Sequence, residues 1–200
     1  NIRPQHPFEQ DWQNYRNIYE ETWIMAGLPI QEWNKLPKQE KTPKLFKWFD
    51  IKKEEKTIVI HCFAGYGRDT MRSPSKEYWE KLIPLIIKLG YKVIRLGHGN
   101  EPVFNVNNDK YKDVRHLSFI EQVQLSISGN LFISTDSGTS LICGAYNEIP
   151  QITLITNWNK GHFQNFFALS PNNDKNMNLF GKDNCDNINI EDVIDEIKHL

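Results

Sequence analysis

From residue 57 onward, runs typical of buried strands alternate with runs typical of amphipathic helices. The strand-like runs are TIVIHCF (57–63), YKVIRLG (91–97), NLFISTD (130–136) and QITLIT (151–156). Strands that alternate with helices form parallel sheets whose two faces are both covered, joined by right-handed crossovers. The sequence therefore predicts an α/β fold, a Rossmann-like open parallel sheet with helices on both faces.

The predicted helices carry apolar residues at three- and four-residue spacings. One lies in SKEYWEKLIPLIIKLG and ends at Gly90. A second begins at Ser118, which forms an S-x-x-E capping box with Glu121. A third covers residues 137–147, and a closing helix covers 189–200. Residues 98–116 and 157–188 are polar and rich in asparagine, and we expect mostly loop there.

The segment before the sheet is different in character. Residues 9–26 have the spacing of an amphipathic helix, and residues 31–55 are rich in Lys, Pro and Glu, as in an extended connection. We therefore expect two units. These are an N-terminal helix with an interdomain connection over 1–55, and the Rossmann-like domain over 56–200.

Composition excludes several classes of protein. Lys and Arg total 24 against 25 acids, so no basic footprint indicates a nucleic-acid partner. No apolar stretch approaches the roughly 20 residues of a transmembrane helix.

Cys62, Cys143 and Cys185 are far apart and form no C-x-x-C pair. We therefore expect buried free thiols in a reducing, cytoplasmic setting, with metal or redox use as the alternative.

Three strand ends carry unusual residues: HCFAGYGRDTMR (61–72), LGHGNE (96–101) and STDSGTS (134–140). In a parallel sheet all three loops emerge at the same edge, where open α/β sheets bind ligands. The sequence therefore predicts one binding site built from these three loops.

The third loop suits a phosphate group. Ser137, Gly138, Thr139 and Ser140 would form the first turn of a helix, whose N–H groups have no intrahelical partners and attract anions. Asp136 has two interpretations of similar weight, a helix N-cap or a ligand contact.

The other two loops add charge. In the first, Arg68 and Arg72 either pair with phosphate oxygens or are solvated, and Gly65 lies beside them. In the second, Glu101 either accepts hydrogen bonds from a ribose or is merely exposed, and His98 is an exposed loop histidine or part of the site. The sequence lacks both G-x-x-x-x-G-K-[ST] and G-x-G-x-x-G, which disfavours P-loop and dinucleotide sites.

Together these features resemble the C-terminal half of the heptosyltransferase-like glycosyltransferases, family 9, of the GT-B fold. The resemblance covers residues 57–156. Arg72 stands seven residues before Trp79, Gly97 begins a G-x-x-x-E pattern, and Asp136 begins D-S-G.

The resemblance implies a donor site for a nucleoside-diphosphate sugar. Arg72 would contact the donor phosphate, Glu101 the ribose, and the backbone of Ser137–Ser140 the diphosphate, with Gly65, Arg68, Asp136, Gly97 and His98 completing the site. It implies no metal and no further cofactor. The acceptor would be a glycan or a glycolipid of lipopolysaccharide type, which leaves peripheral association with a membrane open.

Two features depart from the family. Leu141 stands where the family has histidine after D-[ST]-G-x-x, and residues 1–56 do not look like the acceptor-binding domain that supplies the general base in the family. We therefore expect the donor-binding part of a glycosyltransferase, incomplete without an N-terminal acceptor domain. The alternatives are a non-catalytic nucleotide- or phosphate-binding or interaction module, a GT-B-like epimerase, and an α/β domain with another role.

Overall fold

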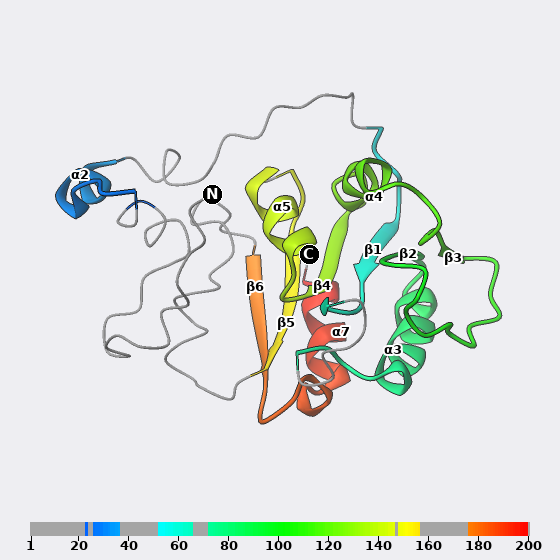
Figure 1. Cartoon of the computed structure of the whole chain (residues 1–200). Coiled ribbons are helices and arrows are strands. Elements are labelled where there is room, and N and C mark those ends of the chain that lie inside the picture. The colour runs from blue at the N-terminus through cyan, green and yellow to red at the C-terminus, as the bar shows by residue number, and fades with distance from the viewer. Residues whose placement is uncertain are drawn as a thin grey trace.

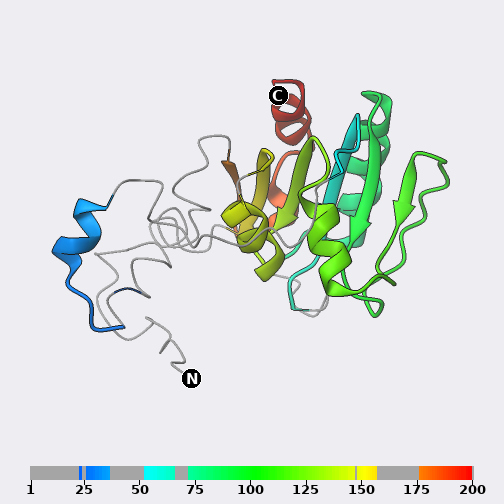
Figure 2. The same cartoon turned by 90° about the horizontal axis from the view of Figure 1, so that it is seen from above.

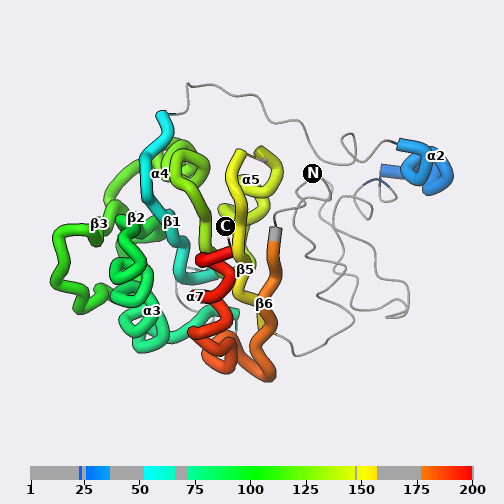
Figure 3. Tube along the Cα trace, turned by 180° about the vertical axis from the view of Figure 1, so that it is seen from behind, coloured from blue at the N-terminus to red at the C-terminus, as the bar shows by residue number. Residues whose placement is uncertain are grey.

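The structure is a computed structural model of the chain, and it describes residues 23, 26–36, 52–65, 72–146, 148–156 and 176–199. Its centre is a six-stranded, wholly parallel sheet with the order β3-β2-β1-β4-β5-β6 (Figure 1). The strands are β1 (Thr57–His61), β2 (Lys92–Leu96), β3 (Tyr111–Asp113), β4 (Leu131–Thr135), β5 (Gln151–Thr156) and β6 (Asn176–Gly181). Figure 3 shows β3 and β6 at opposite edges of this sheet.

Helices cover both faces of the sheet. Those described are α2 (Ile30–Lys35), α3 (Lys76–Lys88), α4 (Phe119–Ser126), α5 (Gly138–Tyr146) and α7 (Ile190–Lys198), with a 3₁₀ turn, η4, at Cys185–Asn187. Figure 2 shows α3 and α7 on one face of the sheet and α4 and α5 on the other. The predicted α/β fold with a Rossmann-like open parallel sheet is confirmed.

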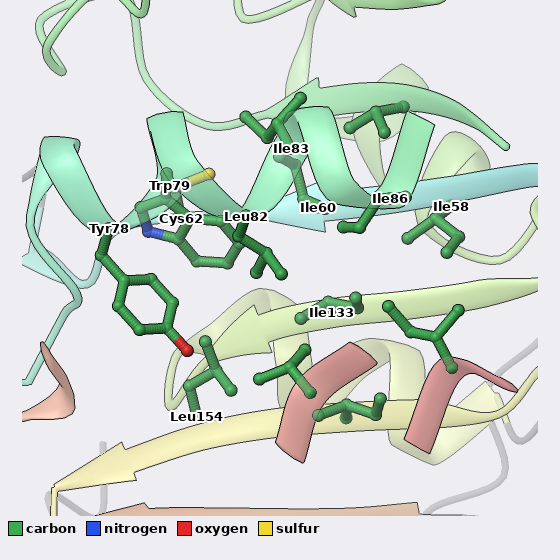
Figure 4. Close-up of a cluster of buried hydrophobic side chains, with 14 of the residues drawn as sticks. Ile58, Ile60, Cys62, Tyr78, Trp79, Leu82, Ile83, Ile86, Ile133 and Leu154 are labelled. Atoms are coloured by element: carbon green, nitrogen blue, oxygen red, sulfur yellow. The ribbon is translucent and has the colours of Figure 1, made fainter. Parts of the chain in front are cut away.

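The larger core lies between the sheet and the α3/α7 layer. Trp79, Leu82, Ile83 and Ile86 form one stripe of α3 and are fully buried. Figure 4 shows this stripe packed towards Ile58 and Ile60 of β1, Ile133 of β4 and Leu154 of β5. The three- and four-residue spacing of the α3 residues places them all on one side of the helix, and that side faces the sheet.

The second core lies under α4 and α5. It contains Val59 of β1, Leu96 of β2 and Phe132 of β4, whose side chains point away from the α3 layer. Successive side chains of a strand alternate between faces, so neighbours such as Ile58 and Val59 belong to different cores. This explains why the central strands carry apolar residues at consecutive positions rather than at every second one.

Local capping signals are confirmed. The Ser118 side chain accepts the Glu121 N–H, and the Glu121 carboxylate accepts the Ser118 N–H, which completes the predicted capping box at α4. Ser75 caps α3 in the same position, accepting the Tyr78 N–H at 3.2 Å. These caps fix where two of the helices begin at the edge of the sheet.

Two strands and one helix were not predicted. β3 and β6 lie in the segments expected to be loop, and α2 lies in the segment expected to be extended. Both strands are edge strands, which need only one partner and tolerate polar residues. In β6, Met177 and Leu179 alternate with asparagines and pack against the core, a weak strand signal that the asparagine content obscured.

Several other expectations concern parts of the chain that the structure does not describe. The helix predicted at 9–26 lies largely outside the described residues, and the division into 1–55 and 56–200 stays a prediction. No helix among the described ranges is long and apolar enough to cross a membrane. All three cysteines are buried free thiols, as predicted.

Candidate functional site

The site lies where the strand order reverses. From β1 the chain runs to β2 and β3 on one side, and then crosses to β4, β5 and β6 on the other. Outside the carboxyl ends of β1 and β4 this leaves a crevice, the position at which doubly wound sheets bind ligands. His61 and Ser134 are register partners there, so the loops that follow both strands open onto the same edge.

A cavity of about 760 Å³ occupies this edge. All three loops that the sequence singled out contribute to its wall. The predicted site residues that line it are Gly65, Gly97, His98, Glu101, Ser137, Gly138 and Thr139. The predicted convergence of the three loops is therefore present in the structure.

The N-terminus of α5 forms one wall. Ser137 precedes the helix, and its Oγ accepts the Ser140 N–H (3.3 Å), while the Ser137 N–H donates to Ser140 Oγ (3.1 Å). Within the part of the chain that the structure describes, the N–H groups of Gly138 and Thr139 have no protein acceptor. These two donors, at the positive end of the helix dipole, suit an anionic ligand group.

The helix start differs from the prediction in two details. α5 begins at Gly138, so Ser137 occupies the N-cap position that was assigned to Asp136. Ser140 is fully buried, and its hydroxyl donates to the Ser137 carbonyl at 2.6 Å. Ser140 therefore braces the helix start and does not line the cavity.

Gly97 and Glu101 form the second wall. Glu101 is 4% exposed, and its Oε1 accepts the His98 N–H at 2.9 Å. Gly97 has a φ of 141°, and a Cβ at this position would lie 2.6 Å from Glu101 Oε1. The spacing G-x-x-x-E thus has a physical reason, because the carboxylate occupies the space that a side chain at residue 97 would take.

Two arginines lie beside Glu101. Arg95 of β2 is fully buried with an Nη2 3.2 Å from Glu101 Oε2, and its guanidinium lies 3.6 Å from the ring centre of Phe104. Arg115 donates to the Glu101 carbonyl at 2.6 Å and lines the cavity. Burial raises the pKa of Glu101, and the His98 N–H and these two cations oppose that shift.

His61 lies at the floor of the cavity, at the end of β1. Its Nδ1 is 3.4 Å from Ser137 Oγ, which links the first strand end to the third. Burial, together with the nearby charge of Arg95, lowers the pKa of His61 to about 4. The imidazole is therefore neutral at physiological pH, and it can donate or accept one hydrogen bond at the floor without adding charge.

Arg72 and Asp136 join the first loop to the third. Arg72 Nη2 lies 2.6 Å from Asp136 Oδ2 and 3.3 Å from the Asp136 carbonyl. Neither residue lines the cavity, but Asp136 directly precedes Ser137, which does. The ion pair holds a cation at Asp136, two residues before the start of α5.

Searches with the sequence find no relative. No protein-family model matches it, and no curated protein matches it either.

Solved structures do share its fold. E. coli ADP-heptose lps heptosyltransferase II superposes with a TM-score of 0.65 at 16% identity, covering 95% of this chain and 63% of that one. A glycosyl transferase family 9 protein from Veillonella parvula gives 0.56 at 12% identity, covering 93% and 52%. E. coli heptosyltransferase WaaC with ADP gives 0.54 at 14% identity, covering 72% and 44%.

The fold is heptosyltransferase-like. This confirms the fold that the resemblance implied, an α/β architecture like that of part of each of these structures. The chain spans less than two thirds of the length of each of these structures.

Within this heptosyltransferase-like fold, sequence reasoning missed part of the cavity wall. The missed lining residues are His61, Phe63, Ala64, Gly99, Arg115, Leu117, Phe119, Gln122, Val123 and Ile142. His61 carried a signal, because it interrupts an apolar strand at its carboxyl end. Most of the others lie on or before α4, which the sequence marked only as a capped helix. Of the predicted residues, Arg68 lies outside the described residues.

The described residues do not support catalysis by a thiol nucleophile or by a bound metal ion. Burial raises the pKa of the thiols of Cys62 and Cys143, so neither is an activated nucleophile at neutral pH. Among the described residues, no three His, Cys, Asp or Glu side chains gather as metal ligands do. What the described wall offers is hydrogen-bond donors, one carboxylate and an apolar side, which suits binding of a nucleotide.

Proposed function

We propose that this chain is the donor-binding part of a glycosyltransferase and binds a nucleoside-diphosphate sugar in the cavity at the switch point. The acceptor is a glycan or a lipopolysaccharide-type glycolipid. The observation that carries the proposal is the wall itself. Gly138 and Thr139, which carry the two N–H donors of α5, line the cavity together with the carboxylate residue Glu101, and the ion pair of Arg72 with Asp136 lies just before α5.

The polar groups of the cavity support binding of a nucleotide. A diphosphate at the N-terminus of α5 would accept from Gly138 and Thr139 and lie near Arg72, which stabilises negative charge. The Glu101 carboxylate would accept hydrogen bonds from ribose hydroxyls, as acids after the second strand do in related sheets. The apolar side of the cavity, which includes Leu117 and Phe119, would receive the base.

The same groups would assist transfer of the sugar. As the bond to the anomeric carbon breaks, negative charge grows on the leaving diphosphate. The α5 N–H groups and Arg72 are fixed before the reaction and would stabilise this charge without reorganisation. The structures that share the fold support this proposal, since one of them is described as a heptosyltransferase with ADP.

The first test is calorimetric titration of the chain with ADP, UDP, GDP and CMP. We expect saturable binding, with ADP preferred. Replacing Arg72 by alanine should weaken binding by about 1–3 kcal/mol, the usual value for a hydrogen bond to a charged group. Lys76→Ala is the matched control, because Lys76 begins α3 and pairs with Glu80, away from the cavity wall.

Two outcomes would count against the proposal. A folded sample that binds none of the four nucleotides would refute donor binding by this chain. Equal affinity in Arg72→Ala and in the wild type would remove Arg72 from the site and leave the α5 donors as the diphosphate contact.

A second candidate, a module that binds a nucleotide sugar without turning it over, is favoured by one observation. Among the described residues that line the cavity, Glu101 is the sole carboxylate, and it is already engaged by Arg95 and by the His98 N–H. It is therefore poorly placed to act as a general base. Release of ADP from ADP-heptose distinguishes the two when the chain is incubated with a glycan acceptor and the acceptor-binding domain that the first proposal requires, because a transferase then releases ADP and a binding module does not.

A further inference from the structure

The buried guanidinium of Arg95 makes hydrogen bonds to the loop that follows β2. This side chain is fully buried; its Nη1 donates to the Pro102 carbonyl at 2.8 Å, and its Nη2 donates to Glu101 Oε2 at 3.2 Å. The guanidinium lies against Phe104 at 3.6 Å and 5.6 Å from the ring centre of Phe63, which lines the cavity. Arg95 therefore contacts the side chain of Glu101 and the backbone that follows it.

Arg115 holds the same loop through its backbone. Its Nη1 donates to the carbonyl of Glu101 at 2.6 Å and to that of His98 at 3.3 Å. Asp113 keeps both arginines in place, with Oδ2 2.9 Å from Arg115 Nη2 and 3.6 Å from Arg95 Nη1. The orientation of Glu101 is thus fixed at the carboxylate and at the main chain.

Burial of these charged groups lowers the stability of the folded protein, which suggests that they have a functional role. Burying the guanidinium of Arg95 and the carboxylate of Glu101 is expensive, and such groups usually stabilise a fold less than apolar residues of the same size would. A buried carboxylate without cations would take up a proton, and it would then lose one of its acceptor oxygens. The two arginines oppose this protonation and hold Glu101, which lines the cavity, in one orientation.

We propose that Arg95 and Arg115 are positioning residues that make the cavity selective for ribose, by holding Glu101 as an ionised acceptor for the ribose hydroxyls. This inference rests on the proposed function. Glu101 distinguishes nucleotides with ribose hydroxyls from those without them. Arg95 and Arg115, which lie outside the G-x-x-x-E motif, make this discrimination possible.

The test compares ADP with 2′,3′-dideoxy-ADP, which lacks both hydroxyls, by calorimetric titration of the full chain. We expect the wild type to prefer ADP about tenfold or more, since hydrogen bonds to a charged group are lost with the hydroxyls. In Arg95→Met the affinity for ADP should fall towards that for the dideoxy nucleotide, while the dideoxy affinity changes little. Arg115→Gln should also lower the affinity for ADP towards that for the dideoxy nucleotide. Because it keeps the buried Arg95, it serves as the test if Arg95→Met does not fold.

The pH dependence of this preference is a second readout that loss of fold alone would not produce. Among the described residues, the charged and titratable groups around Glu101 include Arg95, Asp113, Arg115, His98, His61, Cys62 and Tyr111. Removing Arg95 removes the cation nearest to the carboxylate, so Glu101 should protonate at higher pH. As the pH is lowered, the preference for ADP over the dideoxy nucleotide should therefore disappear at a higher pH in Arg95→Met than in the wild type.

Lys92→Met is the matched control, because Lys92 is an exposed residue of the same strand as Arg95. It should keep the wild-type ratio of affinities at every pH. An equal loss for ADP and its dideoxy analogue in Arg95→Met would show a general structural role and overturn the inference. A wild type that binds both nucleotides equally would overturn it too, while leaving donor binding intact; binding of neither would refute the proposed function itself.

Discussion

Asp136, directly after β4, forms an ion pair with Arg72, 64 residues earlier in the chain, with 2.6 Å between Oδ2 and Nη2. The Asp136 side chain is 7% exposed and the Arg72 side chain 39% exposed, so the pair lies at the rim of the buried sheet edge. It ties the loop after β1 to the loop after β4. The position of Arg72 beside α5 therefore depends on an acid from a different strand.

We predict that this pair matters more for the ligand than for stability. A double-mutant cycle with Arg72→Met and Asp136→Asn, measured by urea unfolding, should give a coupling of about 1 kcal/mol or less, because one partner is substantially solvated. ADP affinity should fall more in Arg72→Met than in Asp136→Asn, which keeps the cation. An equal or larger loss of affinity in Asp136→Asn would instead assign the ligand contact to Asp136.

Gly97 should tolerate no side chain. Alanine there would have to adopt a φ of 141° and would collide with the carboxylate of Glu101. We expect Gly97→Ala to lower the free energy of unfolding by about 1–3 kcal/mol, the usual cost of a forced backbone conformation. Gly99→Ala, where an added Cβ meets no atom within 4 Å, should change stability by no more than about 0.5 kcal/mol. Similar urea midpoints for the two variants would contradict the steric argument.

His61 should make the protein less stable in mild acid. The pKa of His61 falls from an ordinary 6.5 to about 4 on folding, so the unfolded chain binds a proton that the folded one does not. Its contribution to stability is present above pH 6.5 and is lost as the pH falls towards 4. The loss is at most about 3 kcal/mol. His61→Asn should show a smaller fall in unfolding free energy over this range, and an unchanged pH profile would show that His61 titrates normally in the folded protein.

The stripe of α3 should dominate the stability of the larger core. Leu82 is fully buried between the helix and the sheet, whereas Leu89 at the end of the same helix is 38% exposed. Leu82→Ala should cost about 2–5 kcal/mol in unfolding free energy, from lost burial and the cavity left behind. Leu89→Ala should cost no more than about 0.5 kcal/mol. Comparable costs for the two would mean that α3 packs differently from the arrangement in Figure 4.

Much of the candidate site could be predicted because parallel strands put their carboxyl ends on one edge. Gly65, Glu101 and Ser137 lie in three separate loops, and the alternation of strands and helices was enough to bring those loops together. Arg115 could not be found in this way. It follows β3, a three-residue edge strand whose polar sequence resembles a loop, and its contacts with the carbonyls of His98 and Glu101 exist only because β3 pairs with β2.

The sequence by itself determined the elements whose signals are local. The apolar run of β1, the stripe of α3 and the capping box at Ser118 depend on neighbours within a few residues, so their pattern can be read directly from the chain. The tertiary structure decided which charges meet. Arg95 lies in an apolar strand, and nothing near it in sequence shows that it is fully buried against Glu101, Asp113 and Phe104. The pKa values, the orientation of Glu101 and the form of the cavity follow from such contacts between distant segments, because electrostatic interactions depend on distance and burial rather than on order along the chain.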